Sequence, residues 1–146
     1  MPTFGRLCAA VLFGALMWHV SQLARPLFPF GDIPWRWWEI NVAIGVIIGW
    51  TVCGSRLGGG IWPAISAGIT SIVALGFWVL FAHAFVDMLD RALNKRYDGP
   101  MEAVVSVFAL MLDHARILAD PVLLGYFAGG IVIAALLAGL VARRFD

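Results

Sequence analysis

Histidine is the residue type whose placement in this chain best fits cofactor chemistry. The chain has three histidines, His19, His83 and His114. His19 and His83 belong to two different apolar segments, and both lie near the segment end that should meet the same membrane surface. Two neutral imidazoles at one depth on neighbouring helices can ligate haem iron axially. The pair is therefore a candidate site for haem b. The alternative is that each ring bonds a neighbouring backbone group or lies at the interface.

Asp113, His114 and Arg116 form the only tight polar cluster that could support catalysis. Asp113 and His114 are adjacent, so on a helix their side chains diverge by about 100° and do not form an acid–base pair by themselves. We interpret this cluster as the polar surface of a helix. No catalytic residue is predicted, and the chain is not expected to be an enzyme.

The two cysteines, Cys8 and Cys53, form no CxxC motif and no His–Cys cluster. A structural zinc site needs such closely spaced ligands, so no metal site is predicted. We interpret both thiols as small apolar side chains inside helices, although a disulfide between them stays open. No resident cofactor is expected, with haem b as the alternative.

The composition is that of a membrane protein. Of 146 residues, 62% are hydrophobic and 13% are charged, whereas a soluble domain usually has about 25% charged residues. The net charge of +1 gives no electrostatic case for binding nucleic acid. Seven tryptophans are also present, and this residue type favours the membrane interface.

Four apolar segments are long enough to suggest membrane spans, since about 20 residues cross a hydrocarbon core. They cover residues 7–24, 38–53, 61–86 and 122–142. The third is expected to leave the bilayer and continue to residue 95. The whole chain, residues 1–146, is expected to be a single membrane domain.

An amphipathic helix is predicted over residues 101–119, between spans three and four. Glu102, Ser106, Asp113, Arg116 and Asp120 fall within one narrow stripe at helical spacing, and the rest of its surface is apolar. This pattern is typical of a helix that lies in the membrane plane or against another protein. We therefore predict an all-α fold, an integral membrane four-helix bundle with an additional in-plane amphipathic helix. Asp98, Gly99 and Pro100 form the predicted hinge before that helix.

Three pairs of small residues are spaced four apart, which allows close helix contact within the bundle or with a partner. The pairs are Gly45 with Gly49, Ala64 with Gly68, and Gly125 with Gly129. Trp35, Trp37 and Trp38 are expected at headgroup depth as an interfacial belt, with an aromatic ligand cage as the alternative. Asn41 is expected near the same depth. The predicted partners are membrane lipid and other membrane protein subunits.

The charge distribution predicts an orientation. Four spans place both termini on one side, where arginines crowd into short segments: Arg6, Arg56, Arg143 and Arg144. The positive-inside rule therefore places both termini in the cytoplasm. No Asp, Glu, Lys or Arg lies near the middle of a span, which disfavours a transport path. A small channel or oxyanion transporter is the least favoured interpretation.

The segment RYDGPME at 96–102, followed by Ala-Val-Val, resembles the TrgA family of small bacterial membrane proteins. Further similarities lie at Met1-Pro2-Thr3, Asn41…Gly45…Gly49-Trp50 and Met111-Leu112-Asp113…Asp120-Pro121. The resemblance implies an association with tellurite resistance in photosynthetic and related alphaproteobacteria. It brings no catalytic residue, and Ala109 and His114 stand where family members place charged residues.

The residues and the resemblance together predict a non-enzymatic protein of the cell inner membrane. It would be an accessory subunit of a larger energy-transducing or photosynthetic complex. Two cysteines in apolar surroundings are a poor set for handling tellurite, so the expected link to resistance is indirect, through membrane or respiratory stress. The alternative is a b-type haem or quinone-binding electron carrier.

Overall fold

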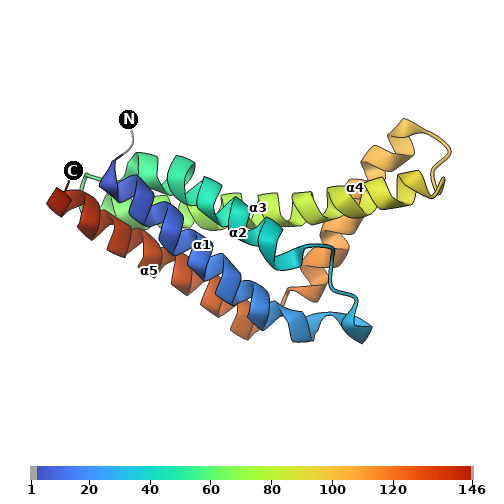
Figure 1. Cartoon of the computed structure of the whole chain (residues 1–146), viewed down its shortest axis with the longest axis horizontal. Helices are drawn as coiled ribbons and strands as arrows, with labels where there is room; N and C mark the ends of the chain where they lie inside the picture. The colour runs from blue at the N-terminus through green and yellow to red at the C-terminus, as the bar shows by residue number, and fades with distance from the viewer. Residues whose placement is uncertain (1–2, 146) are drawn as a thin grey trace.

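The computed structural model describes residues 3–145, and within them the protein is an all-α bundle with no strand. This confirms the predicted fold class. The α-helices of this region, drawn in Figure 1, are α1 (Phe4–Ala24), α2 (Trp37–Ile48), α3 (Ile61–Leu93), α4 (Pro100–Ile117) and α5 (Pro121–Phe145).

Short helical turns connect the first three helices. α1 ends where Pro26 and Pro29 lack backbone donors, and the chain continues through η1 (Arg25–Leu27) and η2 (Pro29–Gly31). α2 is prolonged by a π-helical turn, η3 (Gly49–Cys53), and a 3-10 turn, η4 (Gly54–Arg56). The glycine-rich reversal is therefore confined to residues 57–60. There Gly58 (φ 120°) and Gly60 (φ 114°) adopt backbone angles that glycine tolerates best.

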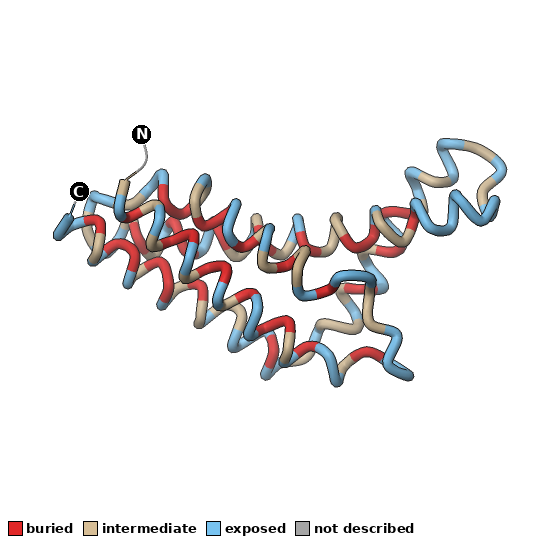
Figure 2. Tube along the Cα trace, viewed as in Figure 1, coloured by how far each residue is buried: buried red, intermediate tan, exposed pale blue. Residues whose placement is uncertain are grey.

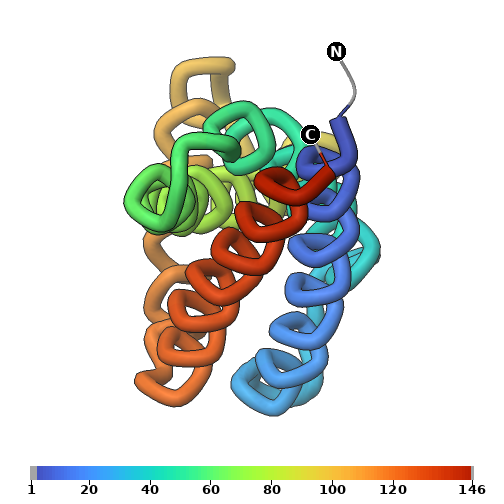
Figure 3. The backbone as a smooth tube through the Cα atoms, turned by 90° about the vertical axis from the view of Figure 1, so that its left-hand side faces the viewer, coloured from blue at the N-terminus to red at the C-terminus, as the bar shows by residue number. Residues whose placement is uncertain are grey.

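The helices pack side by side with both termini at one end of the bundle (Figures 1 and 3). α1 packs mainly on α2 and α5, and α3 packs on α5 and α4. The main core is built from side chains of α1, α3 and α5, among them Phe13, Leu75 and Ile131, each with 0% exposure. Two smaller cores lie towards the other end, one around Phe28 and Trp37 and one between α3 and α4.

Within the described region, four helical segments are long and apolar enough to cross a membrane, by length and composition. These segments are Phe4–Leu27, Trp37–Arg56, Ile61–Leu93 and Pro121–Phe145. Exposed residues recur along these helices (Figure 2). Many of them are apolar, for example Val73, Ile133 and Leu140. A helix that stays apolar where it is not covered by protein is typical of a membrane span. The chain is therefore a multi-pass membrane protein.

α3 is longer than a bilayer requires. Its 33 residues give a length of about 50 Å at 1.5 Å per residue, against a hydrocarbon core of about 30 Å. α4 crosses the far part of α3 at a steep angle to the bundle (Figure 1). It buries Val107 and Leu110 against Ala84 and Met88 of α3. The predicted extension and amphipathic helix are both present, with α3 ending at Leu93 and α4 spanning Pro100–Ile117.

The connection between α3 and α4 changes direction at two places, near Lys95 and at the predicted hinge. Lys95 has a left-handed backbone (φ 53°), whereas Gly99 is extended (φ −165°). The Asp98 backbone N–H donates to Glu102 Oε2 at 2.8 Å, which fastens the start of α4. Pro100 is the first residue of that helix, a position that needs no intrahelical donor. Asp98 and Gly99 thus lie in a bend directly before α4, Pro100 begins that helix, and a separate turn lies at Asn94 and Lys95.

Candidate functional site

Four helices meet at a set of buried polar side chains near the α4 end of the bundle. We call this set the buried polar cluster and define it as Ser21 of α1, Trp37 and Asn41 of α2, His83 of α3 and His114 of α4. Ser21, Asn41 and His83 are each 1% exposed. Interhelical hydrogen bonds between such groups are a recognised source of helix association in membranes. Ionisable groups at such depth also mark functional sites.

The hydrogen bonds fix the orientation of the Asn41 carboxamide. Ser21 Oγ donates to the Met17 carbonyl at 2.5 Å, so its oxygen is left as an acceptor for Asn41 Nδ2 at 2.9 Å. Asn41 Oδ1 then faces His83 Nε2 at 2.9 Å. An amide oxygen only accepts, so the proton of this bond is on Nε2. Each residue of this chain of bonds therefore donates to the next, from His83 of α3 to Asn41 of α2 and from Asn41 to Ser21 of α1.

His83 lies between two other rings. Its imidazole is 4.5 Å from the Trp37 ring and 6.4 Å from the His114 ring, measured between centroids. Trp37 is itself held by a 3.0 Å bond from its indole N–H to the Ser21 carbonyl. His83 Nδ1 is buried and has no hydrogen-bond partner among the described residues. With the proton on Nε2, Nδ1 is an unused acceptor inside the bundle.

His114 links the buried polar cluster to the surface. Its Nδ1 is 2.8 Å from the Leu110 carbonyl, and its Nε2 is 3.4 Å from Asp87 Oδ2. Both ring nitrogens thus lie near oxygens of the protein, one on the backbone and one on a side chain. Asp87 is partly exposed, so the cluster ends at a carboxylate that reaches the protein surface.

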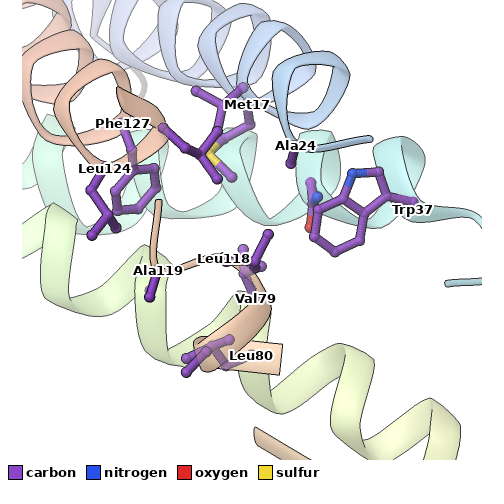
Figure 4. A pocket seen from close by; sticks show the side chains of 14 residues that line it. Met17, Ala24, Trp37, Val79, Leu80, Leu118, Ala119, Leu124 and Phe127 are labelled. Atoms are coloured by element: carbon purple, nitrogen blue, oxygen red, sulfur yellow. The ribbon is translucent and has the colours of Figure 1, made fainter. Parts of the chain in front are cut away.

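A cavity of about 210 Å³ adjoins the inner side of the buried polar cluster. Every α-helix or its flanking turn contributes to its wall, and Figure 4 shows Trp37 on one side of it and Leu124 and Phe127 on the opposite side. Asn41 is the one lining side chain that carries an amide. We call this space the apolar cavity. Its lining residues are Met17, Val20, Ala24, Trp37, Asn41, Gly76, Val79, Leu80, Ala115, Leu118, Ala119, Leu123, Leu124 and Phe127.

A wider hollow of about 910 Å³ adjoins the outer side, between residues 28–35 and helices α3 and α4. Asp87 and His114 line it together with Asp90, Arg91 and Asp113. The buried polar cluster therefore lies between a charged hollow and the apolar cavity. The hydrogen bonds of the cluster do not run from one space to the other, because His83 and His114 are in ring contact at 6.4 Å and not hydrogen-bonded in the structure. Chemically, this arrangement can hold helices together or orient a polar ligand group.

The two predicted haem ligands have different surroundings. The His19 ring is exposed on α1 and lies 6.3 Å from the Tyr126 ring of α5. His83 is buried, and its Nε2 is already bonded to Asn41. A bis-histidine haem needs both imidazoles directed at one iron with free nitrogens. The residues as placed do not fit that group.

Two of the three predicted small-residue pairs lie where helices approach closely. A methyl group on Gly45 would lie 2.8 Å from the Phe13 carbonyl oxygen, and one on Gly49 would lie 2.6 Å from the Ala9 carbonyl oxygen. Gly68 faces Ala135, and Ala64 faces Gly139, across the α3–α5 contact. Backbone and small side chains meet at these positions, so larger residues would separate the helices.

The third pair makes no such contact within the chain. A methyl group on Gly125 or Gly129 would meet no described atom within 4 Å. Both residues are exposed on α5, where they line a shallow groove with Tyr126 and Ile133. Among the described residues, this pair therefore makes no close helix contact inside the bundle. A contact between this pair and a partner protein stays a prediction.

Three members of the buried polar cluster were not recognised as a site from the sequence. The sequence predicts Asn41 near headgroup depth and Trp37 in the interfacial belt, and it does not single out Ser21. The structure corrects the assignment of Trp37, which is 4% exposed, while Trp35 and Trp38 are 66% and 45% exposed. The sequence feature that could have indicated this site is Asn41, a carboxamide in an otherwise apolar segment. Asn41 follows Trp37 by four residues, so both side chains lie on the same side of the helix.

The other polar candidates lie at the surface. Asp113 and Arg116 form an exposed ion pair of 3.6 Å within α4, as expected for a helix surface.

Cys8 and Cys53 are both free thiols, which settles the open question of a disulfide between them. Within residues 3–145, no group of three or more His, Cys, Asp or Glu side chains is arranged to hold a metal ion.

Comparison with protein-family models, with curated proteins and with solved structures finds no match for this chain.

Proposed function

We propose that this chain is a non-enzymatic accessory subunit of a larger complex in the bacterial inner membrane. The observation that carries the proposal is an exposed apolar surface on α4, which we call the α4 outer face. It consists of Met101, Val104, Val105, Phe108 and Leu112, with exposures from 53% to 72%. The opposite side of α4 is already packed on α3. A contiguous apolar face that its own chain leaves uncovered is typical of an interaction surface.

The charges of α4 favour a protein partner over a lipid surface. Helices that lie on a membrane are usually rich in Lys and Arg on their polar side, because lipid headgroups are often anionic. α4 instead carries Glu102 and Asp113 against the single cation Arg116. Its polar side is therefore poorly suited to anionic headgroups, whereas its apolar face suits the surface of another membrane protein.

Co-purification from native membranes in mild detergent tests the proposal. Phe108→Ser places a polar group in the centre of the α4 outer face and is expected to release the partner. Leu93→Ser is a matched control, because Leu93 is 83% exposed at the end of α3 and outside that face. A wild-type chain that always purifies as a lone monomer, or a partner retained equally by both variants, contradicts the accessory role.

The association with tellurite resistance is proposed from the family resemblance and is taken to be indirect. Cys53 is 0% exposed and Cys8 is only partly exposed, so neither thiol is well placed to reduce a dissolved oxyanion. A strain lacking the protein should become sensitive to tellurite. A Cys8→Ser/Cys53→Ser variant should restore resistance, and Phe108→Ser should not. Loss of resistance in the well-folded double cysteine variant would point to direct thiol chemistry.

Both termini are proposed to face the cytoplasm. They lie at the same end of the bundle, as Figures 1 and 3 show. Arg143 and Arg144 lie in the last turn of α5 there, and Arg56 ends η4 just before the short reversal that leads to α3. Accessibility of tags at both termini to a membrane-impermeant reagent checks this orientation, and labelling in intact cells would contradict it.

A further inference from the structure

We infer that a second copy of this chain covers the α4 outer face, with the two α4 helices side by side and antiparallel. The inference rests on the proposed function, because it names the protein that meets this face. In this form the accessory subunit joins its complex as a pair of chains. Two features of α4 carry the inference, namely the direction in which the helix runs and the order of charged and apolar residues along it.

The direction of α4 limits how two copies can meet. α4 crosses α3 at a steep angle to the bundle (Figure 1), so it runs close to the membrane plane when the spans cross the bilayer. It packs beside α3, on Ala84 and Met88, so its opposite side points sideways, away from its own chain. Two copies inserted in the same orientation pair about a two-fold axis along the membrane normal, and two-fold dimers are the commonest oligomers. Such an axis makes two helices that lie in the membrane plane antiparallel.

The charges of α4 are self-complementary in this arrangement. Glu102, Ala109 and Arg116 follow one another at intervals of seven residues, close to two helical turns, so they share one flank of the helix. The two-fold axis sets this flank against the same flank of the second copy. With the axis at Ala109, Glu102 of each chain faces Arg116 of the other. A two-fold interface needs this reciprocity, in which residue i meets residue j and j meets i.

The apolar residues of the α4 outer face share the same centre. Val105 and Leu112 are 60% and 53% exposed. Their midpoint in the sequence lies half a residue before Ala109, a shift of about 0.75 Å along the helix axis. The axis that joins the charges therefore also sets Val105 against Leu112 of the second copy, with Phe108 beside the axis. A parallel pair would instead place every charge level with the identical charge of the other copy.

Both charged side chains keep groups for a second chain. Glu102 Oε2 accepts from the Asp98 backbone N–H, and a carboxylate has further acceptor positions. Arg116 is 71% exposed, and one of its nitrogens lies 3.6 Å from Asp113 Oδ1, whereas a guanidinium has five N–H donors. Exposed ion pairs contribute little affinity, so these pairs set the register and the orientation, and the apolar residues between them supply the affinity.

Disulfide cross-linking in native membranes tests the pairing. The full chain carries Cys8→Ser and Cys53→Ser, so that only an introduced thiol reacts. Ala109→Cys lies at the axis and should give a covalent dimer on oxidation. Leu93→Cys is the matched control, because Leu93 is 83% exposed at the end of α3 and outside the α4 outer face. It should give no dimer.

The same assay reads the register. Glu102→Cys alone and Arg116→Cys alone should give no dimer, because each introduced thiol lies about 21 Å along the helix from its own counterpart at 1.5 Å per residue. A disulfide needs the two Cα atoms within about 7 Å. Co-expression of the two variants should give the mixed dimer, since position 102 of one chain faces position 116 of the other.

Charge reversal tests the ion pairs, with energy transfer between donor-labelled and acceptor-labelled chains in mixed micelles. Glu102→Lys sets a cation against Arg116 of the second copy and should weaken self-association about tenfold. Glu102→Lys/Arg116→Glu restores opposite charges and should recover the wild-type affinity to within about threefold. Asp90→Lys makes the same charge change on α3 and should leave self-association unchanged.

The outcomes separate this inference from the accessory role. A dimer of Glu102→Cys as abundant as that of Ala109→Cys would overturn the antiparallel arrangement. A photoreactive amino acid at position 108 that yields only an adduct with a different protein would overturn the second copy and leave the accessory role standing. Lipid adducts alone from that position would contradict both. Because Ala109 is exposed, its cysteine variant decides the question even if a charge reversal disturbs α4.

Discussion

The bond between Asn41 and His83 gives the sharpest prediction for stability. Asn41→Leu keeps the number and branching of the side-chain heavy atoms and removes two interhelical bonds, to Ser21 and to His83. Such bonds contribute about 0.6 kcal/mol each on average in a membrane protein. The buried His83 Nε2 proton also loses its acceptor, which costs about 1–3 kcal/mol. The free energy of unfolding should therefore fall by about 2–4 kcal/mol.

A double-mutant cycle separates the specific bond from general damage. His83→Leu alone leaves Asn41 Oδ1 without its donor, while the double variant removes both partners and leaves neither orphaned. We expect the double variant to be more stable than the sum of the single effects by about 1–2 kcal/mol. Reversible unfolding in mixed detergent micelles, followed by circular dichroism, measures each corner of the cycle.

Asn94→Leu is the control for this cycle. Asn94 is exposed and its side chain donates only to the Asp90 carbonyl one turn earlier, so its replacement should change stability by about 0.5 kcal/mol or less. Single effects of Asn41→Leu and His83→Leu that add within about 0.5 kcal/mol would refute the bond between these two side chains.

Three further predictions concern packing, α4 and the haem alternative. Gly49→Ala should lower the free energy of unfolding by about 1–3 kcal/mol, because the added methyl would lie 2.6 Å from the Ala9 carbonyl oxygen. The control Gly129→Ala adds a methyl at an open position and should change the free energy of unfolding by about 1 kcal/mol or less. Equal effects in thermal unfolding would contradict the packing. His114→Leu removes the contact with Asp87 and should speed hydrogen exchange in α4 about tenfold. Unchanged exchange there would show that this contact does not hold α4. After haem-replete expression, the purified protein should show no Soret band. A band that persists through gel filtration would contradict the conclusion that His19 and His83 do not ligate one haem.

The number and placement of the helices could be predicted because they follow from local sequence. Apolar segments of about 20 residues and the prolines that interrupt them predicted the spans to within a few residues. The same reasoning located α4 from the periodicity of its polar residues. The π-helical turn at Gly49–Cys53 was not predictable from local sequence, since Gly49 lies directly against the Ala9 backbone of α1.

The candidate site was only partly accessible from the sequence because it depends on how the helices are rotated about their axes. The sequence indicates His83 as a site residue but pairs it with His19. In the structure α2 turns Asn41 and Trp37 inward against His83, and α1 leaves His19 outside. Helical periodicity places Trp37 and Asn41 on one side of α2. Sequence alone does not say which side faces the bundle when nearly all residues of a span are apolar.

The central proposal, an accessory subunit docked through α4, is tested most directly by cross-linking in native membranes. A photoreactive amino acid in place of Phe108 samples the centre of the α4 outer face, and one in place of Val73 samples an exposed part of α3 within the span. The proposal predicts a discrete protein adduct from position 108 and only lipid adducts from position 73. Lipid adducts alone from position 108 would contradict it.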